Sequence, residues 1–320
     1  MKTVILLLLA CGSVHALPFE KEKLLPPKGK TIVMLNAAAN SEHLDVFKRV
    51  TGYSPSGHKF WMNLDEPDYV ELHEKMAPYN DSLMITLLFG KETVGKELAP
   101  QGEKLTRVTS GRYDDALNKL GNELKTYGKP VYLDIGNEAE FFYPGHARDF
   151  VKAYRYVHNK LKPLCQDNVL FFWHTVTDLG FAPKSKEWYP GDEFVDGIGL
   201  SLYNDSQFRS AETFITYAKQ RKMPVAIFEI GLAPHKARDN HGSVWDSTWK
   251  GYYRRIFDFV ERHDIPLLGY AGFGDEVFTE PGPFHHNRID YLAPDIQDGW
   301  TGMLKRPRYD RSRADEKPKR

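Results

Sequence analysis

Eight short apolar runs alternate with segments of helical spacing, and this alternation limits the possible folds more than any other feature of the chain. The runs are residues 31–36, 59–64, 83–89, 131–133, 169–173, 194–200, 225–228 and 266–271. Strands that alternate with helices are typical of a parallel sheet. Eight such units need roughly 250 residues, which the 320-residue chain supplies. The predicted fold class is therefore α/β, a (β/α)8 TIM barrel.

Between these runs, apolar residues recur at helical spacing. The predicted helices are residues 41–50, 67–78, 113–127, 147–161, 211–220, 244–263 and 289–304. The connection over residues 90–110 is long and polar, which predicts a binding loop.

The two ends of the chain are interpreted separately from the barrel. Residues 1–16 have a charged start, a short apolar stretch and a small residue at the end, as in a secretory signal peptide. Residues 17–304 are expected to form the barrel domain. Residues 305–320 hold eight basic and three acidic side chains. We interpret this tail as disordered rather than as a polyanion-binding arm.

Charge and cysteine content narrow the classes of partner. The formal net charge of +0 gives no electrostatic reason to expect nucleic acid or an anionic membrane as a partner. After removal of the signal peptide, Cys165 is the only cysteine, so no intramolecular disulfide is expected. Asn80 and Asn204 begin N-x-Ser sequences, and Asn80 is the expected glycan acceptor of a secreted, monomeric glycoprotein.

Two of the apolar runs deliver a glutamate to their ends. Residues 129–138 read KPVYLDIGNE and residues 223–231 read MPVAIFEIG, so Glu138 and Glu229 follow the fourth and seventh predicted strands. Chemistry in a (β/α)8 barrel takes place at the carboxyl ends of its strands. Apolar neighbours there would raise the pKa of a carboxyl group and suit it to proton donation.

A pair of carboxyl groups in one site suits the hydrolysis of a glycosidic bond. Retaining glycosidases use one as general acid/base and the other as nucleophile, about 5–5.5 Å apart. We assign Glu138 as the acid/base and Glu229 as the nucleophile. Asn137 is expected to bond the sugar 2-hydroxyl, and Tyr203 is expected to donate its hydroxyl to Glu229.

Further candidates come with structural alternatives. His174 follows the fifth strand and is interpreted as either a subsite residue or a structural histidine. Trp61 and Trp188 are candidates for stacking on sugars or for core packing. The spacing of the remaining histidines and carboxylates matches no familiar ligand pattern, so no metal site is predicted.

Three longer stretches resemble glycoside hydrolase family 26. They are residues 110–115 (SGRYDD), 188–201 (WYPGDEFVDGIGLS) and 222–231 (KMPVAIFEIG), and the resemblance extends over about residues 31–270. It implies a retaining (β/α)8 enzyme of a family that contains endo-β-mannanases, β-xylanases and mixed-linkage β-glucanases. It implies no metal and no organic cofactor.

The chain departs from the family pattern around the proposed site. The family usually has histidine at the position of Asn137 and arginine at that of Asp134. The tryptophan that often follows the eighth strand in the wider clan has no match, and Phe273 or Tyr270 is expected to replace it. These differences lie among the residues that surround the sugar and leave the two glutamates in place.

The sequence thus predicts a secreted retaining endo-β-glycosidase that hydrolyses mannan, xylan or β-glucan. An inactive barrel that binds glycan in an extracellular matrix is the main alternative, and retention of both glutamates argues against it. A third interpretation is a hydrolase for an anionic, glycosaminoglycan-like polymer, for which the surface potential around the site would be diagnostic.

Overall fold

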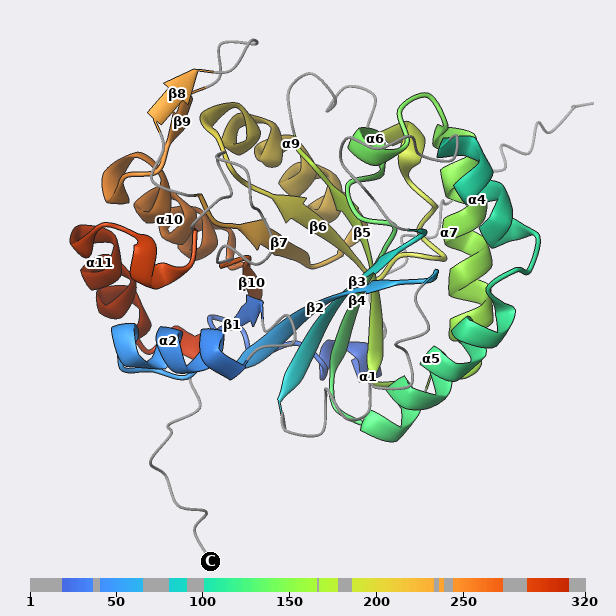
Figure 1. Cartoon of the computed structure of the whole chain (residues 1–320), viewed down its shortest axis with the longest axis horizontal. Helices are drawn as coiled ribbons and strands as arrows, with labels where there is room; N and C mark the ends of the chain where they lie inside the picture. Colours follow the sequence, from blue (N-terminus) through green and yellow to red (C-terminus); the bar gives the residue numbers. More distant parts are fainter. Residues whose placement is uncertain are drawn as a thin grey trace, which may run out of the picture.

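Eight parallel strands form a closed barrel with helices around it in the computed structural model (Figure 1). The structure describes residues 19–36, 41–65, 81–90, 101–165, 167–177, 186–232, 236–238, 244–272 and 287–310. The barrel strands are β1 (Thr31–Asn36), β2 (Gly57–Asn63), β3 (Ser82–Leu88), β4 (Val131–Ile135), β5 (Val169–Thr175), β6 (Gly197–Ser201), β7 (Val225–Ile230) and β10 (Leu267–Tyr270). Because β10 pairs in parallel with β1, the ring is complete and the predicted barrel is confirmed.

Helices follow most of these strands and cover the outside of the barrel (Figure 1). The longer ones are α2 (Ser41–Thr51), α4 (Gln101–Thr109), α5 (Asp114–Tyr127), α7 (Ala147–Leu161), α9 (Asp205–Arg221), α10 (Arg254–His263) and α11 (Pro294–Leu304). The shorter ones are α1 (Phe19–Glu22), α6 (Ala139–Phe142), η2 (Lys186–Trp188), η3 (Trp249–Tyr253) and η4 (Ile289–Tyr291). None of the helices within the described ranges is long and apolar enough to cross a membrane.

Three helix predictions need correction. Part of the expected loop, Gln101–Thr109, is helix α4. Helix α9 begins at Asp205 rather than at residue 211, because Asn204 caps it. The helix expected over 244–263 is three elements: strand β9 (Val244–Asp246), which pairs with β8 (Lys236–Arg238), the π-helix η3 and helix α10. The helix expected over residues 67–78 lies outside the described residues.

The barrel interior is apolar toward the amino ends of the strands. The side chains packed there are Ile32, Met34, Met84, Tyr132, Leu170, Phe172, Ala226, Phe228 and Leu267. Leu24 and Leu25, just after α1, pack against this cluster, and the Tyr132 hydroxyl donates to the Leu24 carbonyl at 2.6 Å. The chain that precedes β1 therefore closes this end of the barrel.

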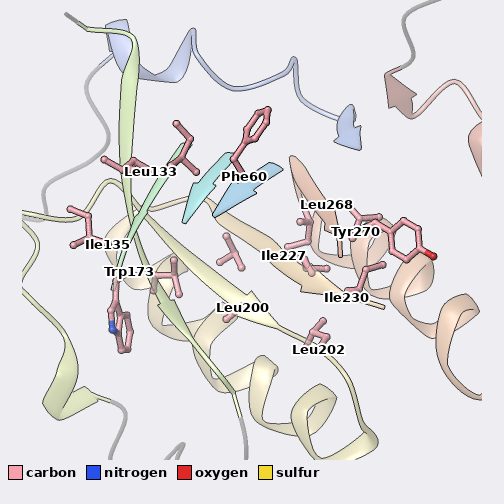
Figure 2. Packing of buried hydrophobic residues seen from close by; sticks show 14 of the residues in the cluster. Phe60, Leu133, Ile135, Trp173, Leu200, Leu202, Ile227, Ile230, Leu268 and Tyr270 are labelled. Carbon is pink, nitrogen blue, oxygen red and sulfur yellow. The ribbon is translucent and has the colours of Figure 1, made fainter. Parts of the chain in front are cut away.

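A second, larger apolar layer lies between the strands and the helices. Figure 2 shows part of it, including Phe60, Leu133, Trp173, Leu200 and Ile227. Side chains alternate between the two faces of a strand, so these residues point outward while their neighbours point into the barrel. Trp173 is fully buried in this layer.

The chain after α11 also belongs to the barrel. Tyr309 and Asp310 form strand β11, which pairs in parallel with Thr31 and Ile32 of β1. Tyr309 is buried, and Arg308 bonds Asp264 at 2.7 Å. The expected boundary at residue 304 is therefore too early. Residues 311–320 and the proposed signal peptide lie outside the described residues.

Candidate active site

Polar side chains replace apolar ones inside the barrel at the carboxyl ends of the strands. Alternation along each strand points a buried polar residue inward from β2, β3, β4, β5 and β6. These residues are Lys59, Thr86, Asp134, His174 and Ser201. One end of the barrel is thus sealed by apolar groups, and the other holds a cluster of ionisable ones.

Glu138 reaches this cluster through a sharply bent connection. Gly136, Asn137 and Glu138 follow β4 with φ angles of 86°, 28° and 36°. A non-glycine residue at positive φ costs on the order of 1–3 kcal/mol and persists only where the surroundings enforce it. Here the amides of Phe141 and Phe142 donate to the Glu138 carbonyl at 2.8 and 3.2 Å, which fixes the turn into α6.

Glu229 reaches the cluster through an irregularity in β7. Leu200 of β6 pairs with Ile227, whereas the next residue, Ser201, pairs with Glu229. Ile227 and Ile230 both lie in the outer apolar layer (Figure 2), and Phe228 lies in the barrel interior. Strict alternation would turn Glu229 outward beside the helices. The bulge adds one residue and turns its carboxyl group inward.

Both oxygens of the Glu229 carboxyl group accept a hydrogen bond. Lys59 donates to Oε1 at 2.6 Å and the Tyr203 hydroxyl donates to Oε2 at 2.7 Å. The Lys59 ammonium also bonds the Phe228 carbonyl at 3.0 Å. Burial by itself would raise the pKa of Glu229, but the Lys59 charge and these hydrogen bonds hold it below its ordinary value. Glu229 is therefore ionised at neutral pH, and its contact with Tyr203 is as predicted.

The pKa of Glu138 is shifted in the opposite direction. Burial and the negative charge of Glu229 raise the pKa of Glu138 to about 7, against a smaller lowering by His174. Its Oε1 is buried and has no hydrogen-bond partner among the residues that the structure describes. Two carboxyl groups with pKa values driven apart by their surroundings are the arrangement that separates an acid from a nucleophile.

His174 joins this cluster through two hydrogen bonds. Its Nδ1 lies 2.9 Å from Asp134 Oδ2, and its Nε2 lies 2.8 Å from Ser201 Oγ. Burial opposes a charge on the ring, yet the Asp134 carboxylate raises the pKa of His174 above its ordinary value. The side chain is 1% exposed, so His174 is a structural histidine within the site rather than a residue open to substrate.

The other predicted site residues divide into two groups. Asn137 is buried beside Glu138, and its Oδ1 has no partner within the described ranges. Trp61 is half-buried, with its ring centre 4.2 Å from the Lys59 ammonium, so it lies at the site. Of the two interpretations of Trp188, the structure supports core packing: it is 5% exposed and packs on Phe150 of α7, 5.7 Å between ring centres.

The structure places one of the two proposed replacements for the missing tryptophan, and Tyr270 does not lie at the site. Tyr270 points outward and packs on Trp300 of α11 at 4.9 Å between ring centres, because its position on β10 faces the helices. Phe273 lies outside the described residues.

The sequence interpretation missed Lys59 and Glu140. Lysine is rarely fully buried without a partner, so Lys59 inside a strand already indicated a buried carboxylate. Glu140 on α6 accepts from the Val176 amide at 3.0 Å and from the Thr175 hydroxyl, which ties α6 to the end of β5. Phe141, one turn past Glu138, is 55% exposed and was not assigned to the site.

Two features bear on ligands and modification. In the part of the chain that the structure describes, no group of three or more His, Cys, Asp or Glu side chains is arranged to hold a metal ion. Asn204 is buried, and its side-chain oxygen accepts from the Ser206 and Gln207 amides, so it serves as a helix cap. Asn80 lies outside the described residues.

Comparisons with known proteins agree with this geometry. Residues 106–254 match the family model described as glycosyl hydrolase family 26. A beta-1,3-xylanase from Alcaligenes sp. is 22% identical, over 94% of this chain and 68% of that protein. The beta-1,3-xylanase TXYA from Vibrio sp. is also 22% identical, over 94% and 69%. The structure of GH26C from Muricauda sp. MAR_2010_75 has a TM-score of 0.67 at 14% identity, over 90% of this chain and 88% of that one.

The structure is a closed (β/α)8 barrel with glutamates at the ends of its fourth and seventh strands. Together with these relatives, this arrangement defines a glycoside hydrolase that degrades polysaccharide. Within that class, the family that the chain resembles is glycosyl hydrolase family 26, whose model matches its middle part.

Proposed function

We propose that the protein is a secreted, retaining endo-β-glycosidase, with Glu138 as acid/base and Glu229 as nucleophile. The observation that carries the proposal is that two buried glutamates of one site have different partners, which shift their pKa values in opposite directions. Glu229 has a donor on each carboxyl oxygen, whereas Glu138 has a pKa raised to about 7 and an Oε1 without a hydrogen-bond partner among the described residues.

In the first step, Glu138 gives its proton to the glycosidic oxygen while Glu229 attacks the anomeric carbon. The bond to the leaving sugar breaks, and an ester forms between the Glu229 carboxyl group and the remaining glycone. Glu229 loses its negative charge in this ester. Since that charge raises the pKa of Glu138, its loss lowers the pKa and prepares Glu138 to act as a base.

In the second step, Glu138 takes a proton from water, and the water oxygen attacks the anomeric carbon. The ester bond breaks, Glu229 regains its charge, and the sugar leaves with its original anomeric configuration. Asn137 Oδ1 is buried and unpaired within the described ranges, so it is available to accept a hydrogen bond from the sugar 2-hydroxyl, where contacts strengthen in the transition state.

Xylan with β-1,3 links is the first substrate to test. The sequence left mannan, xylan and β-glucan open, and the two relatives that match 94% of this chain are both named beta-1,3-xylanases. Trp61, half-buried beside Lys59, offers an aromatic ring for stacking on a sugar. Secretion follows from the signal-like residues 1–16.

The test is release of reducing ends from β-1,3-xylan, β-1,4-xylan, mannan, β-glucan and an acidic glycan. We expect hydrolysis of at least one neutral polymer by the wild-type protein and a loss of about 10⁴-fold or more in Glu229→Ala, because the nucleophile is removed. Proton NMR of the first product should show the retained anomer.

Glu138→Gln separates the two roles. It should lose most activity on the polysaccharide but still form the glycosyl-enzyme from an aryl glycoside whose leaving group needs no proton. Binding of one polymer without any hydrolysis by the wild-type protein would favour the glycan-binding barrel instead. Inversion at the anomeric carbon would contradict the double-displacement mechanism.

A further inference from the structure

Asp134, His174 and Ser201 form a hydrogen-bonded chain from three neighbouring strands toward Glu138. Asp134 Oδ2 lies 2.9 Å from His174 Nδ1, and His174 Nε2 lies 2.8 Å from Ser201 Oγ. The Ser201 side chain also interacts with the Glu138 carboxyl group and lowers its pKa. All four residues are buried, so water does not compete for these bonds.

The charges around His174 indicate its protonation state. It faces the Asp134 carboxylate on β4, Glu138 beyond β4, Glu140 on α6 and Glu229 on β7. Buried charges in proteins are normally paired. Lys59 on β2 pairs with Glu229, which leaves the buried Asp134 carboxylate with His174 as its ion-pair partner. An imidazolium ring balances that charge.

The protonation state of His174 determines the direction in which each hydrogen bond of this series is donated. An imidazolium donates from both nitrogens. Ser201 Oγ then accepts from His174, and its own proton is free to point toward Glu138. A neutral ring would instead accept the Ser201 proton at Nε2, and Glu138 would lose its donor.

We propose that Asp134, His174 and Ser201 are positioning residues for Glu138: the His174 imidazolium, held by Asp134, donates to Ser201, and Ser201 donates to one oxygen of the Glu138 carboxyl group. The catalytic proton then resides on the opposite oxygen. This assignment explains why Oε1 is buried without a partner among the described residues, because that oxygen faces the glycosidic bond. The proposal rests on the acid/base role of Glu138 proposed above.

The same bond acts in the second half of the reaction. Once Glu138 has given up its proton, the Ser201 hydroxyl and the nearby imidazolium stabilise the new carboxylate. They oppose the burial that would otherwise keep Glu138 protonated and unable to activate water. The chain therefore holds Glu138 in one orientation and allows it to alternate between acid and base.

Ser201→Ala tests the proposal because alanine fills the same space without a donor. The high-pH limb of kcat/KM should move up by about one pH unit, the order of change expected from one hydrogen bond to a carboxylate. At neutral pH, kcat should fall by about tenfold, a part of what a general acid supplies. KM should be unchanged, because Ser201 acts through Glu138 in this proposal. Ser201→Thr keeps the hydroxyl and should restore the wild-type limb.

The matched control is Ser210→Ala. Ser210 on α9 is also a buried serine, and its Oγ has no bond within the part of the chain described. Its removal should leave the pH profile unchanged. Equal profiles for Ser201→Ala and the wild-type protein would overturn the proposal.

A second measurement does not depend on hydrolysis. With ¹³C-labelled glutamate, the carboxyl titration of Glu138 should shift to higher pH in Ser201→Ala but not in Ser210→Ala. With ¹⁵N-labelled histidine, His174 should carry protons on both ring nitrogens at pH 7. A neutral His174 ring at that pH would contradict the proposed direction of the hydrogen bonds from His174 to Ser201 and Glu138. If these signals appear in a protein that cleaves none of the polymers, the proposed function fails and the hydrogen-bonded chain remains.

Discussion

Two chemically identical side chains, Glu138 and Glu229, have pKa values shifted in opposite directions because of their partners. Glu229 accepts from Lys59 and Tyr203, whereas Glu138 Oε1 has no partner among the described residues. Burial acts on both carboxyl groups in the same direction, so the bonds and charges at each one decide the outcome. The hydrogen bonds and charges at each carboxyl group therefore determine which glutamate is the acid.

Glu138→Gln should stabilise the fold at high pH. The pKa of Glu138 is raised in the folded state, so its ionisation costs stability as the pH rises above the unfolded value of about 4.3. The rise from 4.5 to about 7 corresponds to roughly 3 kcal/mol at pH 8. We expect the variant to have a higher melting temperature than the wild-type protein at pH 8. At pH 4 the two melting temperatures should be equal. A lower melting temperature at pH 8 would contradict the assignment of Glu138 as the perturbed group.

Lys59→Met should move the low-pH limb of kcat/KM upward by at least about one pH unit. Without the ammonium, burial raises the pKa of Glu229, and the nucleophile is protonated at pH values where it was ionised. The stability that the ionised Glu229 contributes above its unfolded pKa should also be lost at neutral pH, by about 3 kcal/mol.

The control for this variant is Lys160→Met. It breaks an ion pair of similar length with Asp114, which lies on the surface far from the barrel interior. A pH profile is the readout, and thermal unfolding at pH 4 and pH 8 measures the stability change. If both variants shift the low-pH limb of the kcat/KM profile equally, Lys59 does not specifically keep Glu229 ionised.

At the scale of elements, the start of α9 fixes one of the donors to Glu229. Tyr203 directly precedes Asn204, whose side chain caps the helix and forms a capping box with Gln207. The side-chain amide of Gln207 also donates to the Val176 carbonyl, which lies beyond β5, at 2.7 Å. The helix cap thus connects the ends of β5 and β6 and positions the Tyr203 hydroxyl.

Asn204→Ala should lower the free energy of unfolding by about 1 kcal/mol, the usual value of a helix N-cap. Because Tyr203 is adjacent, kcat should also fall. Asn204→Asp keeps an acceptor at the cap and should preserve stability. Urea unfolding compares the three proteins. Equal loss in both variants would show that the cap is not what stabilises this connection.

At the scale of the whole molecule, the barrel has one sealed end and one reactive end. Leu24 and Leu25 close the apolar end, and β11 occupies the edge of β1 beside Thr31 and Ile32. Tyr309 of β11 packs perpendicular to Phe257 of α10, 5.4 Å between ring centres. Residues that are distant in sequence thus hold the first strand of the ring in place.

Tyr309→Ala should destabilise the protein by about 3 kcal/mol, in the range for removing a buried aromatic ring. Tyr309→Phe keeps the ring and loses only a weak contact of 3.5 Å to Glu261, so it should lie near the wild-type value. Thermal unfolding is the measurement. A small effect of Tyr309→Ala would mean that β11 is not part of the cooperative fold.

Local sequence was sufficient for the eight barrel strands, for the barrel and for the position of the two glutamates after two of these strands. Apolar runs of strand length are visible without tertiary information, and Glu138 and Glu229 directly follow two of them. The helix that begins at Asp205 was predicted to begin late, because its first turn carries polar residues that the cap and the barrel bury.

Only the tertiary structure decided which side chains meet inside the barrel. Lys59 and Glu229 are 170 positions apart, and no local pattern links them. The inward turn of Glu229 depends on a bulge that is defined by pairing with β6 and β10. Trp188 and Tyr270 appeared available for sugar but face the helices. The spacing of apolar residues in the sequence determines which residues are buried. Closure of the barrel determines which buried side chains contact each other, and these contacts set the charge on each glutamate.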